Sequence, residues 1–191
     1  MHKNRLEAFS DGVLAIVLTI MVLELKIPHS VEFAELWALW PVFTSYVLSF
    51  IYIGIYWNNH HHMLYSVGHV NGAVLWSNLH LLFWLSLIPF STGWMGENHF
   101  SRLPTLVYGA NLLACAIAYS VLQLRLIKLE GKGSVLARAI GTDWKGKISP
   151  ILYILGMLAD WFFAPLAGLA FYALTALMWL IPDRRIENVL K

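Results

Sequence analysis

The sequence predicts an all-α integral membrane protein that crosses the bilayer six times, with its N- and C-termini in the cytoplasm. Three observations lead to this prediction: the composition, long runs without charge, and the uneven distribution of basic residues. Of the 191 residues, 59% are hydrophobic and 13% are charged, whereas roughly 25% are charged in a typical soluble domain. A soluble exterior needs charged side chains, so this composition indicates a membrane protein.

Uncharged runs locate the first expected helices, because a helix needs about 20 mainly apolar residues to cross ~30 Å of hydrocarbon. The first span is expected near the N-terminus, over 5–25. Residues 36–96 contain no Asp, Glu, Lys or Arg, and polar residues over 58–72 divide this run in two. A further uncharged run covers 103–124. These runs predict four spans.

The C-terminal run, 148–182, contains a single charged residue, Asp160. Its length fits two short helices with a turn at 160–165, where Pro165 suits the first turn of the second helix. One long helix is the alternative. The six expected spans, which form one domain over 1–191, are 5–25, 36–57, 70–92, 103–124, 148–163 and 165–182.

The basic residues orient these spans, since Lys and Arg are enriched in cytoplasmic loops. With six spans and a cytoplasmic N-terminus, the outer side carries only Lys26 and Arg102, whereas five spans would place the basic C-terminus outside. The segment 125–147 is expected on the inner membrane surface. The cytoplasmic set is Lys3, Arg5, Arg125, Lys128, Lys132, Arg138, Lys145, Lys147, Arg184, Arg185 and Lys191.

The first expected helix is unusual, because its uncharged core is short and is flanked by Asp11 and Glu24. Charges are costly against lipid tails, so this segment is expected to be the poorest lipid-facing span and to lie inside a bundle or along a water-filled path. Ile16, Ile20 and Leu23 share one face at i, i+4 and i+7, with Thr19 beside them. An ordinary packing stripe and a pore constriction both fit this pattern.

The start of this helix carries the pattern R-x-x-x-F-S-D, formed by Arg5, Phe9, Ser10 and Asp11. The pattern resembles the hallmark of the endolysosomal potassium channel family, transmembrane protein 175, and its bacterial homologues. The resemblance extends along the whole chain, although its specificity rests mainly on the first span. The further matching residues are Trp57, His60, Asn78, Pro89 and Phe90.

The resemblance implies a homotetramer in which four copies of the first helix surround a central pore. It implies a constriction of apolar side chains seven, eleven and fourteen residues after the motif Phe, which are Ile16, Ile20 and Leu23. Thr19 matches a hydroxyl position in some bacterial members. The expected activity is passage of potassium ions, with modest selectivity over sodium and without the T-V-G-Y-G carbonyl filter.

The same resemblance implies no cofactor and no catalysis. The expected location is the cell membrane, which is the inner membrane in a bacterium. The expected partners are further copies of the chain, the lipid bilayer and potassium ions. A net charge of +2 argues against nucleic-acid binding.

The carboxylate of Asp11 needs a partner near the membrane. Arg5, the Trp57 indole N–H and His60 are candidate partners, so a hydrogen-bonded cluster is expected to fix the first helix against the second and third spans. The alternative is that Asp11 caps the helix or faces water.

Histidines at 60–62, together with His69 and His80, invite a metal site. Consecutive side chains on a helix point about 100° apart, so three adjacent histidines do not converge on one ion, and no metal is expected. A small secondary transporter or proton-coupled carrier that uses Asp11 and the histidines is the alternative function.

Overall fold

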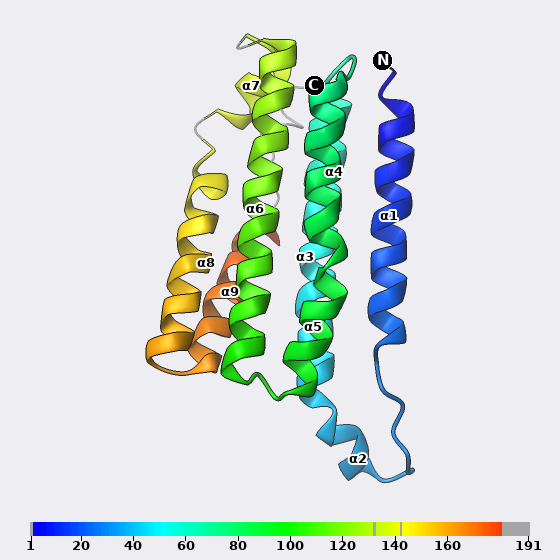
Figure 1. Ribbon diagram of the computed structural model, residues 1–191, viewed down its shortest axis with the longest axis vertical. Coiled ribbons are helices and arrows are strands. Elements are labelled where there is room, and N and C mark those ends of the chain that lie inside the picture. Colours follow the sequence, from blue (N-terminus) through cyan, green and yellow to red (C-terminus); the bar gives the residue numbers. More distant parts are fainter. Residues whose placement is uncertain (1, 132, 142, 181–191) are drawn as a thin grey trace.

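The computed structural model describes residues 2–131, 133–141 and 143–180. Within these ranges the chain is built from α-helices joined by short connections (Figure 1). The all-helical class expected from the sequence is therefore confirmed. The helices are α1 (Asn4–Leu23), α2 (Phe33–Ala38), α3 (Trp40–Tyr65), α4 (Gly72–Ser86), α5 (Ile88–Glu97), α6 (Arg102–Glu130), α7 (Val135–Ile140), α8 (Trp144–Phe162) and α9 (Pro165–Leu180).

Two expected spans, 36–57 and 70–92, are each divided by a break close to a proline. The short helix α2 ends at Ala38, and α3 then starts with Pro41 in its first turn. In the same way α4 ends at Ser86, and α5 follows with Pro89 in its first turn. Proline lacks a backbone N–H and fits the first turn of a helix, so each proline begins a new helix.

The polar break expected over 58–72 lies where the structure has a connection, but it is shorter than expected. The helix α3 continues through the three histidines to Tyr65, and the connection to α4 follows at residues 66–71. Helix α6 also runs six residues beyond the expected end, from Arg102 to Glu130. The expected spans marked the uncharged runs correctly, but a helix continues into polar sequence where its side chains reach water or polar partners.

The C-terminal run forms a helical hairpin rather than one long helix. Helix α8 ends at Phe162 and α9 begins at Pro165. The two helices pack closely, because a β-carbon at Gly168 would lie 2.9 Å from the Asp160 β-carbon. The end of the expected span at 182, and the basic residues Arg184, Arg185 and Lys191, lie outside the described residues.

Helix α1 lies at one edge of the molecule, and α8 lies at the opposite edge (Figure 1). Within the chain α1 contacts α3, α4 and α5. Within the single chain α1 therefore lies at an edge rather than inside a bundle, and the alternative expectation of a water-filled path along it stays a prediction. The remaining helices run roughly alongside one another, with α2 and α7 near opposite ends of the molecule.

The prediction that the first segment is the poorest span is wrong. Among the described residues, three helical stretches are long and apolar enough to cross a membrane: 4–23, 72–97 and 102–130. Their most apolar 18-residue windows have mean hydropathies of 2.0, 1.5 and 1.7, respectively. Asp11 lies within the 20-residue helix α1, and Glu24 directly follows its end, so the uncharged core underestimated the length of the helix.

Buried tyrosines and hydroxyls connect α3, α5, α6 and α9 at the centre of the fold. The Tyr52 hydroxyl donates to the carbonyl oxygen of Tyr172 at 2.6 Å. Ser49 Oγ is hydrogen-bonded to Thr92 Oγ1 at 2.7 Å and to the Tyr108 hydroxyl at 2.9 Å. Buried polar groups need such partners because water is absent. The core is therefore held by specific polar contacts as well as by apolar packing.

Replacing Gly96 by alanine is expected to destabilise the contact between α5 and α3 by about 1–3 kcal/mol, the usual cost of overpacking. The new β-carbon would lie 2.9 Å from Val42 Cα and 3.0 Å from Ser45 Oγ. Gly93→Ala is the control on the same helix, because its β-carbon would meet nothing within 4 Å. Thermal unfolding in detergent measures both variants. Equal melting temperatures would contradict this close approach.

Candidate pore helix and its anchoring contacts

Helix α1 has one face covered by the rest of the chain and one face left uncovered. The covered face consists of Leu6, Ser10, Leu14, Val17 and Met21, all of which are buried. The uncovered face includes the expected constriction residues: the exposed fractions are 59% for Ile16, 41% for Ile20 and 80% for Leu23. The motif residue Phe9 is also exposed, at 54%. The single chain therefore presents an apolar helical surface that its own helices do not cover.

Thr19 lies on the same uncovered face, between the positions of Ile16 and Ile20. Its hydroxyl donates to the carbonyl oxygen of Ile16 at 2.8 Å. A threonine hydroxyl has one proton and two lone pairs, so this bond uses the proton and leaves acceptor capacity on the oxygen. Thr19 thus presents an electron-rich oxygen on an otherwise apolar face.

The covered face of α1 is anchored by a chain of buried hydrogen bonds. His60 Nε2 is 2.7 Å from Asn78 Oδ1, and Asn78 Nδ2 donates to Ser10 Oγ at 2.9 Å. The Ser10 hydroxyl in turn donates to the carbonyl oxygen of Leu6 at 2.8 Å. Because Asn78 Oδ1 is an acceptor, His60 Nε2 carries the proton. Each donor in this series of hydrogen bonds points towards α1, so the series joins both α3 and α4 to α1.

Asp11 follows Ser10 and makes a separate contact with α3. Trp57 Nε1 donates to Asp11 Oδ1 at 3.0 Å. Trp57 and His60 lie three residues apart on α3, so the two contacts are about one turn apart. Of the three candidate partners, the carboxylate is bonded to Trp57, whereas His60 is directed to Asn78 and the motif residue Arg5 is exposed. The cluster joins the three expected helices through these pairings.

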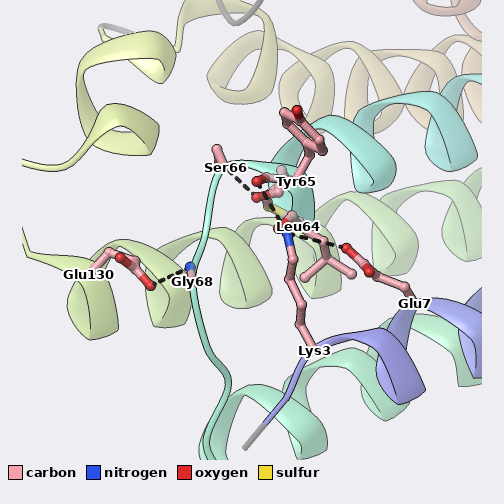
Figure 2. Close-up of polar contacts among 8 residues, drawn as sticks. Lys3, Glu7, Leu64, Tyr65, Ser66, Gly68 and Glu130 are labelled. Carbon is pink, nitrogen blue, oxygen red and sulfur yellow. Dashed lines mark hydrogen bonds and ion pairs between the residues drawn. The ribbon is translucent and has the colours of Figure 1, made fainter. Parts of the chain in front are cut away.

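A second anchor, which sequence reasoning missed, lies at the N-terminal end of α1 (Figure 2). Lys3 Nζ donates to the carbonyl oxygens of Leu64 and Tyr65 at 2.8 and 3.2 Å, and it lies 3.6 Å from Glu7 Oε1. The last carbonyls of a helix have no partner within the helix, and a lysine ammonium satisfies them. Lys3 therefore caps the C-terminus of α3 from α1.

The loop that follows α3 is also held from the other side by α6. Gly68 N donates to Glu130 Oε1 at 3.1 Å (Figure 2), and His69 Nδ1 lies 3.5 Å from the same oxygen. Glu130 is the last residue of α6. The loop between α3 and α4 thus joins the end of the candidate pore helix to the end of the longest helix.

The opposite end of α1 borders an open cavity of about 490 Å³. Ile20 and Glu24 line it from the α1 side, and Glu97 lines it from α5. Lys26 forms an ion pair with Glu97 at 3.0 Å. The uncovered face of α1 therefore ends in a mainly apolar recess that holds two acidic side chains, Glu24 and Glu97.

The adjacent histidines point in different directions. His60 is bonded to Asn78 on α4, whereas the His61 ring stacks between Trp57 and Tyr65, with ring centroids 6.2 and 6.3 Å away. Among the described residues, no group of three or more His, Cys, Asp and Glu side chains could hold a metal ion. His80 accepts a hydrogen bond from Trp84 one turn along α4.

Comparison with known proteins shows which family this chain resembles. Residues 5–89 match the family described as "Endosomal/lysosomal potassium channel TMEM175". A potassium channel of Chryseobacterium sp. (strain P1-3) is 55% identical over 191 residues, which is 100% of this chain and 99% of the relative. The chain belongs to the TMEM175 family. The resemblance drawn from R-x-x-x-F-S-D is therefore confirmed.

Other members of the TMEM175 family extend the comparison. The crystal structure of a lysosomal potassium-selective channel TMEM175 homologue from Chamaesiphon minutus matches with a TM-score of 0.83 and 28% identity, covering 95% of this chain and 97% of that one. The endosomal/lysosomal proton channel TMEM175 of Homo sapiens is 29% identical over 140 residues, 66% of this chain and 27% of the human protein. The protein is thus a membrane ion channel and not an enzyme.

Asn78→Ala is expected to destabilise the fold by about 1–3 kcal/mol, because it leaves the buried His60 N–H without its acceptor. Asn98→Ala is the matched control, since the Asn98 amide is exposed and bonds only within its own helical end, to the carbonyl oxygen of Trp94. Thermal unfolding of the two variants gives the difference. If the Asn78→Ala protein is as stable as the Asn98→Ala protein, the buried series of hydrogen bonds does not anchor α1.

Proposed function

We propose that the protein is a potassium channel, modestly selective over sodium, in which four chains assemble around a central pore lined by α1. Potassium is the permeating ion, and the channel needs no cofactor. The observation that carries this proposal is the uncovered apolar face of α1, which holds Ile16, Ile20 and Leu23 while the opposite face is fixed to α3 and α4. Four such faces around an axis cover one another and leave a narrow path.

The chemistry of this face suits ion selection by partial dehydration. A ring of aliphatic side chains excludes a fully hydrated ion, and it also closes a pore by dewetting. Potassium holds its water less tightly than sodium, so the same ring passes potassium more easily. The Thr19 oxygen, with free acceptor capacity beside the apolar side chains, would replace part of the lost hydration shell. Selectivity of this origin is modest because the ring itself offers no carbonyl oxygens.

The proposed topology has six crossings, with both chain ends in the cytoplasm of the cell that carries the channel in its plasma or inner membrane. Lys3, Arg5 and the end of α6 then lie on the cytoplasmic side, whereas Lys26 and Arg102 lie outside. The positive-inside distribution supports this arrangement. The recess that holds Glu24 and Glu97 would form the outer mouth, and the Asp11–Trp57 contact would lie towards the inner mouth.

Replacing Ile16 by asparagine is expected to raise the single-channel conductance and bring the potassium/sodium permeability ratio closer to one, because a polar ring no longer demands dehydration. Planar bilayer recordings measure both quantities. Val22→Asn serves as the control: Val22 is also exposed on α1 but points about 120° away from Ile16. If Ile16→Asn conducts like the wild type, Ile16 does not form the constriction.

Oxidative cross-linking is expected to give disulfide-linked dimers when a cysteine replaces Leu23, since four copies of this residue would surround the axis and each thiol can pair with one neighbour. The native Cys115 is fully buried, so it contributes little background. Trp161→Cys is the control, because Trp161 is exposed on α8 at the edge of the chain opposite α1. Equal yields of dimer from the two variants would contradict a pore lined by this face of α1.

Flux into liposomes separates this channel from a coupled carrier. A channel passes potassium down its gradient without a second ion, whereas a proton-coupled carrier stops when the proton gradient is removed. Here Asp11 is bonded to Trp57 and His60 to Asn78, so these groups serve as anchors. Potassium flux that depends strictly on a proton gradient would favour the carrier.

A further inference from the structure

Asp160 lies at the C-terminal end of α8, in the helical hairpin at the edge of the chain opposite α1 (Figure 1). Its exposed fraction is 0%. The described part of the chain contains three fully buried side-chain polar atoms without a hydrogen-bond partner, and two of them are the carboxyl oxygens of Asp160. The third is the hydroxyl oxygen of Tyr172. Other buried polar side chains, such as Ser10 and Asn78, have their partners.

The side chain of Asp160 is fixed where it lies. Its β-carbon and the carbonyl oxygen of Gly156 would each be 2.9 Å from a β-carbon at Gly168, so α8 and α9 touch at this level. The close contact leaves the carboxyl group between the helices and prevents it from turning out to water without separation of the hairpin. Two groups face it from the helices packed against α8: Arg102 from α6 and Tyr172 from α9.

A carboxylate in these surroundings is unfavourable. Burial of a charge without a hydrogen-bonding or charged partner is far more costly than burial of a neutral acid, and such a group takes up a proton instead. Arg102 is exposed and forms no ion pair with Asp160, so its charge is screened by solvent. The neutral acid removes the buried charge without any rearrangement of the hairpin.

We propose that Asp160 is a proton-binding site, and that the α8–α9 hairpin folds around its neutral carboxylic acid. The ligand is a single proton, taken from the outer aqueous side, where the end of α8 lies in the proposed topology. The site lies far from α1, so it is separate from the path proposed for potassium. Release of the proton as the pH rises places a charge between α8 and α9 and loosens the hairpin.

Infrared spectroscopy of the whole protein in lipid nanodiscs tests the protonation directly. At about pH 5, where an exposed aspartate is ionised, the wild type is expected to show the carbonyl-stretch band of an un-ionised carboxylic acid, and carboxyl-¹³C aspartate labelling should shift this band. The band should be lost in Asp160→Asn and kept in Asp143→Asn, whose carboxylate accepts hydrogen bonds from Gln123 and Gly146. The labelled wild type gives an answer even if Asp160→Asn does not fold. A wild-type spectrum without a labelled acid band overturns the proposal.

Unfolding at different pH values gives a second readout. Because the folded state keeps the proton to higher pH than the unfolded state, the unfolding constant should rise with pH between the two proton-release points, by up to about tenfold per pH unit. Asp160→Asn should lose this rise, since its amide does not titrate, whereas Asp143→Asn should retain it. Identical pH profiles for the wild type and Asp160→Asn overturn the proposal.

Discussion

The need to satisfy polar groups inside an apolar structure determines how α1 is held. The side chain of Asn78 accepts from His60 on α3 and donates to Ser10 on α1, so one buried amide joins three helices. In a hydrocarbon environment an unsatisfied polar group costs several kcal/mol, which makes these pairings more specific than apolar contacts. The position and rotation of α1, and therefore the direction of its uncovered face, depend on this amide.

The molecule consequently has two unlike sides. On one side, α6, α8 and α9 bury tyrosines and hydroxyls in a self-contained core, with Tyr52 bonded across to the Tyr172 backbone. On the other side, α1 leaves Ile16 and Leu23 uncovered. This asymmetry suits the proposed pore, because a subunit that lined a shared pore would complete its core on one side and leave it incomplete on the other.

The sequence predicted features formed by residues close together along the chain, and it missed contacts between residues far apart along the chain. The motif at Arg5–Asp11 was sufficient to predict the family, and the uncharged runs were sufficient to predict the all-helical class. The breaks before Pro41 and Pro89 were missed because the surrounding residues stay apolar. The capping of α3 by Lys3 could not be predicted, since it joins a side chain to carbonyl groups 61 and 62 residues away. The partner of Asp11 was left open for the same reason: only the packing of α1 on α3 decides between Trp57 and the other donors.

The unequal lengths of the helices have one more consequence. Helix α1 has 20 residues and α6 has 29, which correspond to about 30 and 43 Å at 1.5 Å per residue. The longer helix adjusts to bilayers of different thickness by tilting. Helix α1 only matches the thickness of an average bilayer, so it has no extra length with which to span a thicker one. A thicker bilayer would therefore draw lipid past the polar ends of α1 before those of α6. The lipid composition of the host membrane is thus a stronger physical variable for α1 than for α6.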